Sequence, residues 1–197
     1  MTKIINKKPE RDSIESDYID KQEFYEVIVG YKEACTKAEL ESAEKPPIPE
    51  YCGKAIMDIA EHYSWNRKFM GYSYRDVMVS DAIMDCIKYF DNFNEKKYKN
   101  PLAYFTRICH FAFINRINLE EEVRYSMYKS FDMTLNTEDA FMLDDETNLI
   151  NNPVYEQIQE FIQKFEDKME RRKQKKKERM RKKREEDRLA KENEQNE

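Results

Sequence analysis

Glycine is nearly absent from this chain, occupying three of 197 positions. Two-residue hairpin turns need backbone angles that glycine adopts most easily, and phosphate-binding loops are rich in glycine. The scarcity therefore argues against sheets joined by tight turns and against nucleotide-binding loops. Aromatic residues make up 13% of the chain, which is enough for a compact core although 38% of the residues are charged. Together with the helical spacing of the apolar residues, this composition predicts an all-α fold.

Capping patterns mark helix starts at Asp20 and at Asn100. Asp20 and Glu23 have the spacing of a capping box, and apolar residues follow at helical intervals. Asn100 and Pro101 combine a good N-cap residue with proline at the first helical position. The helix that starts there is expected to continue toward Tyr128.

Two more helices are expected between these starts. One is predicted from about Lys54 to Tyr63, where apolar residues recur on one face. The other is predicted to begin after Ser73, because Asp76 stands three positions later, as in a capping box.

The chain divides by composition into four parts. Residues 1–19 are predicted to be a flexible arm, 20–130 a helical domain, 131–153 an acidic linker, and 154–197 a charged C-terminal helix or tail. The first turns of the last part carry an apolar stripe, so they are expected to pack on the body or on a partner. This stripe consists of Tyr155, Ile158, Ile162 and Phe165.

Positive charge is concentrated near the C-terminus. Residues 168–184 contain twelve basic and two acidic residues, a local charge of +10, which leaves −15 for the rest of the chain. An acidic body has no general attraction for DNA, because phosphate contacts require cations. Two interpretations of the basic segment stay open: it contacts DNA phosphates, or it is a solvated face.

No motif predicts catalysis or a metal site. The four cysteines form no C-x-x-C pair, so we expect no zinc, and Cys86 and Cys109 are predicted to be buried free thiols. The sequence has no G-x-S-x-G, P-loop or H-E-x-x-H motif, so we expect no enzyme activity and no cofactor. No apolar run is long enough to cross a membrane, and residues 1–14 are too polar for a signal peptide, which predicts an intracellular protein.

The most basic and aromatic part of the predicted domain is residues 95–116. Basic side chains attract phosphates, and aromatic rings stack on unpaired bases with a gain of about 1–3 kcal/mol per base. Two interpretations are open: the rings fill a core, or the segment holds a melted DNA strand. Its cations are Lys96, Lys97, Lys99, Arg107, His110 and Arg116, and its rings include Tyr98, Tyr104, Phe105, Phe111 and Phe113.

This segment overlaps the run Phe93-Asn94-Glu95-x-Lys97-Tyr98-Lys99-Asn100-Pro101-x-Ala103-Tyr104. Shorter landmarks around it are Gly53-Lys-Ala-Ile-Met57, Ile59-Ala60-Glu61, Asp81-x-Ile83, Ala112-Phe113 and Arg116-Ile117. In this order, these residues resemble the late-transcription sigma factors of T-even-type bacteriophages. That family is similar, more remotely, to the second conserved region of bacterial primary sigma factors.

The resemblance implies a helical domain like sigma region two. One helix, here residues 74–90, would dock on a coiled coil of the largest subunit of the host core RNA polymerase. The next, residues 101–117, would recognise and open A·T-rich late promoter DNA. The implied polymerase-binding residues are Ser80, Asp81, Ile83 and Ile87. The implied DNA-binding residues are Lys96, Lys97, Lys99, Tyr104, Arg107, His110 and Arg116, with Tyr104 in the place of an aromatic that stacks on a flipped base.

Two features of the sequence depart from the related sigma factors. Arg107 and Ile108 replace the paired tryptophans of the primary factors, so promoter opening is expected to rely more on accessory factors or supercoiling. The hydrophobic-acidic tail that binds the DNA sliding clamp in the phage family is not seen in residues 191–197.

The resemblance also implies a set of partners and a location. The partners would be core polymerase, promoter DNA, a phage co-activator and the sliding clamp, with no membrane, in the cytoplasm of an infected bacterium. Two alternatives remain: a DNA- or RNA-binding protein acting through its basic tail, and a helical interaction module with no nucleic-acid role.

Overall fold

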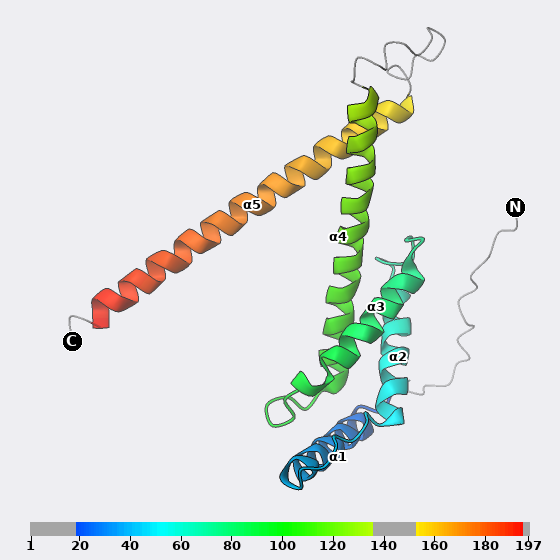
Figure 1. The fold of residues 1–197 in the computed structure, drawn as a ribbon, viewed down its shortest axis with the longest axis vertical. Helices are drawn as coiled ribbons and strands as arrows, with labels where there is room; N and C mark the ends of the chain where they lie inside the picture. The colour runs from blue at the N-terminus through cyan, green and yellow to red at the C-terminus, as the bar shows by residue number, and fades with distance from the viewer. Residues whose placement is uncertain (1–18, 136–152, 195–197) are drawn as a thin grey trace, which may run out of the picture. The chain divides into compact units, whose positions relative to one another are not determined.

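The computed structural model describes residues 19–135 and 153–194, and the side chains of these residues as far as residue 188. All regular structure in these ranges is helical, which confirms the predicted all-α fold (Figure 1). The elements are α1 (Lys21–Leu40), α2 (Glu50–Ser64), α3 (Arg75–Lys88), the 3-10 helix η1 (Phe90–Asn92), α4 (Pro101–Leu135) and α5 (Pro153–Glu194).

Tertiary contacts divide the chain into two units, residues 1–117 and residues 118–197. The division therefore falls inside α4, where the sequence carries no break. Residues 131–135, predicted to begin the acidic linker, extend α4, and the rest of that linker as far as 152 lies outside the described residues. The predicted flexible arm also lies outside them, except for Ile19, which is buried in the core.

Local capping determines two of the helix starts, as predicted. The Asp20 carboxylate accepts hydrogen bonds from the backbone N–H groups of Gln22 at 2.8 Å and Glu23 at 3.1 Å. The Asn100 side-chain oxygen accepts from the Ala103 N–H at 3.1 Å, directly before α4. These bonds satisfy donors that have no partner within the helix.

The helix predicted after Ser73 is α3, but the capping box predicted for its start is wrong. The N-cap residue is Tyr74 rather than Ser73, and no side chain caps the helix. Instead, the Arg75 guanidinium lies 4.0 Å from the centre of the Trp65 ring, across the turn from α2 to α3. This cation–π contact holds the start of α3 against the residue that ends α2. The helix predicted from about Lys54 to Tyr63 is α2, which begins four residues earlier, directly after Pro49.

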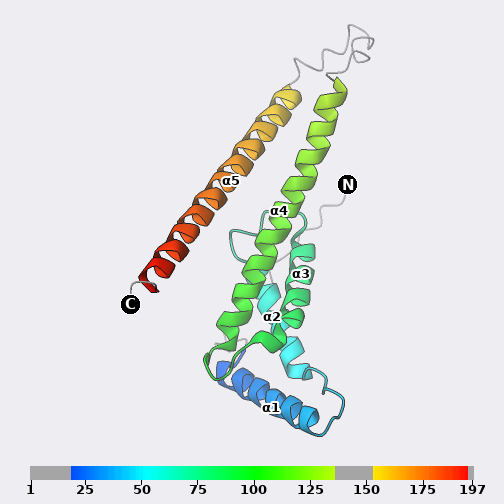
Figure 2. The same cartoon turned by 60° about the vertical axis from the view of Figure 1, so that its left-hand side comes forward.

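The first unit packs its helices around an aromatic core. Figure 2 shows α2 and α3 alongside the N-terminal half of α4, with α1 lying across one end of them. Phe105 of α4 is fully buried, and its ring lies 5.6 Å from the rings of both Phe24 and Phe90. Cys86 and Cys109 are buried free thiols, as predicted, with their sulfur atoms 3.7 Å apart.

The second unit is a hairpin of two helices that run in opposite directions, the C-terminal half of α4 and the N-terminal half of α5 (Figure 2). The rings of Tyr125 and Phe165 stack at 4.5 Å, and the edge of Tyr128 meets Phe161 at 5.3 Å. The apolar stripe predicted at the start of the tail therefore packs against α4. Polar contacts extend this hairpin contact at both ends: Tyr155 donates to Asp132 at 2.7 Å, and Arg172 donates to Asn118 at 2.8 Å.

Candidate nucleic-acid interface

The loop between η1 and α4 presents three lysines and one ring to solvent. Lys96, Lys97 and Lys99 are exposed, and the Tyr98 side chain is 51% exposed. The Lys97 ammonium lies 5.3 Å from the centre of the Tyr98 ring. Cations and a ring are therefore available together, as expected of a surface that binds phosphates and bases.

The base of this loop is fastened to α1. The Tyr25 hydroxyl donates to the Glu95 carbonyl at 3.0 Å. The Lys32 ammonium donates to the carbonyls of Asp91 and Phe93 and pairs with the Glu95 carboxylate at 3.1 Å. The backbone N–H of Glu95 and the Lys32 ammonium hold the pKa of that carboxyl below its usual range. Because its base is anchored, the loop can present its lysines in a defined place.

The first turns of α4 continue this surface through Arg107 and Phe111. Both side chains are exposed, Phe111 to 52%, and the Arg107 guanidinium lies 5.7 Å from the Phe111 ring centre. Their i,i+4 spacing places them on one face of the helix. Asn100, at the end of the loop, is seven positions before Arg107 and falls on the same face.

Tyr104 is not exposed in the same way. Its hydroxyl donates to the Tyr89 carbonyl at 3.0 Å, and its ring lies 5.3 Å from Phe93 and 5.1 Å from Phe105. Burial raises the pKa of its phenol. Of the two interpretations of this segment, Tyr104 agrees with the one in which the rings fill the core. Its ring packs against other side chains of the protein, and its hydroxyl joins α4 to the end of α3.

His110 is also engaged within the fold. Its Nδ1 atom is 2.9 Å from the Tyr63 hydroxyl, and the two rings meet edge to face at 6.2 Å. The side chain is half-buried. The imidazole therefore links α4 to α2.

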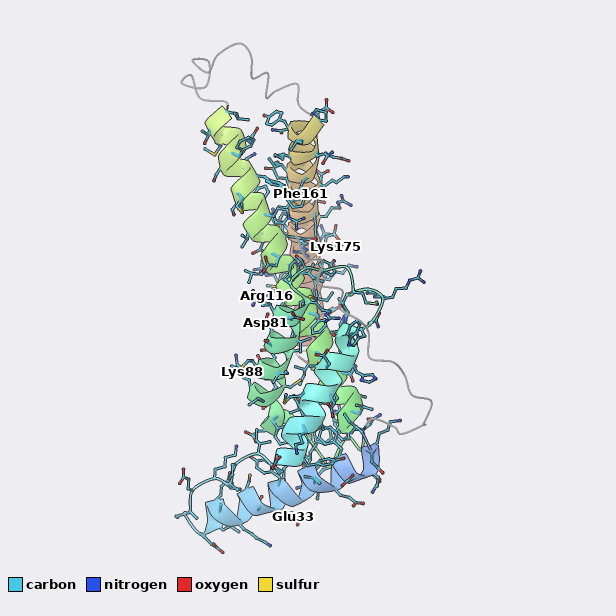
Figure 3. All side chains as sticks on the ribbon, turned by 90° about the vertical axis from the view of Figure 1, so that its right-hand side faces the viewer. Glu33, Asp81, Lys88, Arg116, Phe161 and Lys175 are labelled. Atoms are coloured by element: carbon cyan, nitrogen blue, oxygen red, sulfur yellow. The ribbon has the colours of Figure 1, made fainter. Side chains whose placement is uncertain are left out.

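Arg116 and Asp81 were expected in two different interfaces, yet they bind each other. The Arg116 Nε atom donates to one Asp81 carboxylate oxygen at 2.6 Å, and a terminal guanidinium nitrogen donates to the other at 2.9 Å (Figure 3). The side chains are 22% and 33% exposed. A half-buried, two-bond pair of this kind is among the stronger polar contacts in proteins. It fastens α3 to α4.

The remaining predicted residues of α3 separate into two groups. Ser80 and Ile87 are exposed, whereas Ile83 packs partly against the core. Two residues not named from the sequence complete the exposed face: Val77 is 43% exposed and Met84 is 68% exposed. Val77, Ser80, Met84 and Ile87 follow one another at intervals of three, four and three residues. That spacing was visible in the sequence, but apolar residues of an amphipathic helix are usually assigned to the core.

No group of three or more metal-ligating side chains comes together within residues 19–135 and 153–194. Among the helices described, none is long and apolar enough to cross a membrane. Comparison of the chain with known protein families found no matching family model, and comparison with curated proteins found no match.

Proposed function

We propose that the chain is a sigma subunit that binds the core RNA polymerase of a bacterial host and directs it to A·T-rich bacteriophage late promoters. The sequence from Phe93 to Tyr104 supports this proposal through its resemblance to the T-even-type late sigma factors. One structural observation carries it further. Exposed cations and exposed rings lie together on the loop before α4 and on the first turns of α4, in the part of the chain where the resemblance expects promoter DNA.

The exposed residues of this surface suggest which side chains contact phosphates and which stack on bases. Lys96, Lys97, Lys99 and Arg107 carry the charges that would contact phosphates. Tyr98 and Phe111 are the exposed rings of this surface, so we assign base stacking to them in place of Tyr104. Among the residues first expected to bind DNA, His110 and Arg116 would act through the fold, by linking α4 to α2 and α3.

Polymerase docking is assigned to the exposed face of α3. Three apolar side chains, Val77, Met84 and Ile87, leave substantial area open to solvent on a helix whose opposite face is buried. A row of exposed apolar residues at helical spacing is typical of a helix that packs on a partner. The acidic body agrees with this role, since a polymerase supplies the positive channel that holds the DNA. This function would place the protein in the cytoplasm of an infected cell, with a phage co-activator and sliding clamp as further partners.

Run-off transcription tests the proposal. Core polymerase is supplied with a template that carries an A·T-rich late promoter, with and without the full-length chain. We expect a transcript of defined length only when the chain is present, and co-purification of the chain with core polymerase. No transcript and no co-purification would refute the proposal. Such a result would favour one of the alternatives, a nucleic-acid-binding protein that acts through α5 or an interaction module.

A further inference from the structure

Residues 171–184 of α5 form a basic stretch of helix that none of the other described elements covers. Residues 171–184 contain eleven cations and one acidic residue. Every side chain in this segment is exposed, and helical structure continues through it without a break. At 1.5 Å per residue, the segment is about 20 Å long.

Most of these cations are not neutralised by carboxylates. Arg171 donates to the backbone carbonyl of Asp167 at 3.3 Å, and Arg172 donates to the amide oxygen of Asn118. Within the described residues, no salt bridge involves residues 171–184. The first half of α5 differs, because Lys164 pairs with Glu160 and Lys168 pairs with Glu121. A solvated, solubilising helix usually interleaves both signs of charge, and this segment does not.

The cations surround the helix instead of forming one side of it. At 100° per residue, Lys175 and Arg179 lie on one flank, Lys177 lies on the opposite flank, and Lys176 and Lys183 lie between them. Met180 is the one apolar side chain from residue 171 to 188. A membrane-surface helix needs a continuous apolar face, and so does a helix that packs into a protein groove. Both kinds of partner are therefore disfavoured.

We propose that residues 171–184 bind the groove of duplex DNA without sequence preference. The major groove of B-form DNA is wide enough to admit an α-helix, and phosphates line both of its walls. Cations on opposite flanks of one helix match that arrangement. The segment has no aromatic ring for stacking on single strands, and the major groove of A-form RNA is too narrow for side chains to read. This site goes beyond the proposed function, because it requires neither polymerase nor promoter.

Fluorescence anisotropy of the full-length chain with a labelled duplex that lacks any promoter tests this site without polymerase. The variant Lys175→Gln, Lys176→Gln, Arg179→Gln, Lys183→Gln removes four exposed charges and keeps good helix formers. We expect duplex affinity to fall at least tenfold at low salt. The slope of log affinity against log salt should become shallower by about 0.9 for each phosphate that the variant no longer neutralises.

A matched control removes the same charge elsewhere. The variant Lys21→Gln, Lys37→Gln, Lys54→Gln, Lys68→Gln changes four exposed lysines of the first unit and is expected to bind nearly as the parent does. A second variant, Lys175→Arg, Lys176→Arg, Lys183→Arg, keeps the charge and should keep the affinity. Unchanged binding by the first Gln variant, or an equal decrease in the control, would overturn the proposal. Tighter binding to single strands, to RNA duplex or to anionic vesicles than to duplex DNA would overturn it as well.

Discussion

The carboxylate of Asp81 and the guanidinium of Arg116 form a two-bond ion pair, with N–O distances of 2.6 and 2.9 Å. One residue belongs to the helix assigned to polymerase docking and the other to the helix assigned to DNA. The pair therefore joins the two proposed interfaces within one unit. It also means that substitutions at either position act first on the fold.

Breaking this pair is expected to destabilise the first unit. Arg116→Met should lower the free energy of unfolding by about 1–3 kcal/mol, since it leaves a half-buried carboxylate without its charged partner. Urea denaturation of Arg116→Met, Asp81→Asn and the double variant measures the coupling between them. The double variant should be destabilised much less than the sum of the two single variants. Additive effects would show that the pair contributes nothing.

The docking face of α3 can be tested without disturbing that pair. Met84→Asp and Ile87→Asp place a charge on exposed positions, so stability should change by less than about 0.5 kcal/mol. Affinity for core polymerase should fall at least tenfold, about 1.4 kcal/mol. Met57→Asp on α2 is the control, because Met57 is 56% exposed and lies on another helix. If both α3 variants bind core polymerase with the parent affinity in a titration, this face of α3 is not the docking site.

Tyr104 is expected to contribute to stability more than to DNA contact. Tyr104→Ala should cost about 2–4 kcal/mol of unfolding free energy, because its ring packs on Phe93 and Phe105. Tyr104→Phe keeps the ring and should cost only about 1 kcal/mol, because it removes the hydrogen bond to Tyr89. Thermal or urea unfolding separates the two variants. A Tyr104→Ala protein of full stability that fails to open promoters would restore the stacking role.

Phe111 is expected to act at the promoter instead. Phe111→Ala removes a ring that is 52% exposed, so folding should be retained. Open complexes should become about fivefold to a hundredfold fewer, since one stacked base contributes about 1–3 kcal/mol. Permanganate reactivity of promoter thymines measures the open state. Phe131→Ala, an exposed phenylalanine farther along α4, is the control. Equal reactivity for Phe111→Ala and its parent would argue against stacking there.

Thiol labelling tests the packing of the first unit. Cys52, Cys86 and Cys109 are buried, and burial raises the pKa of the Cys52 thiol to about 11. Since the thiolate is the reactive form, these residues should react slowly in the native protein. Cys35 is half-buried and should supply the one fast thiol, which Cys35→Ser would remove. In urea, the other three thiols should also react quickly. More than one fast thiol in the native protein would contradict the burial of Cys52, Cys86 and Cys109.

The sequence alone determined the features that depend on near neighbours. Helix starts at Asp20 and Asn100 follow from hydrogen bonds that span two or three residues, so local patterns predict them. The apolar stripe at the start of α5 was likewise readable from spacing, because one face of a helix repeats every three or four residues. The exposure of residues 171–184 also agrees with the sequence, because Met180 is their one apolar residue and no apolar stripe can form there.

Only the tertiary structure decided which charged and aromatic side chains make contacts within the fold and which face solvent. In the sequence, Arg116 is one more cation of residues 95–116. The structure places its partner Asp81, 35 residues earlier, beside it. Tyr104 and Phe111 are both rings on α4, yet one packs against Phe93 and the other faces solvent. Such differences arise from contacts between helices, which no local pattern encodes. Burial and pairing depend on where distant segments meet, because a side chain's desolvation is set by all of its neighbours in space.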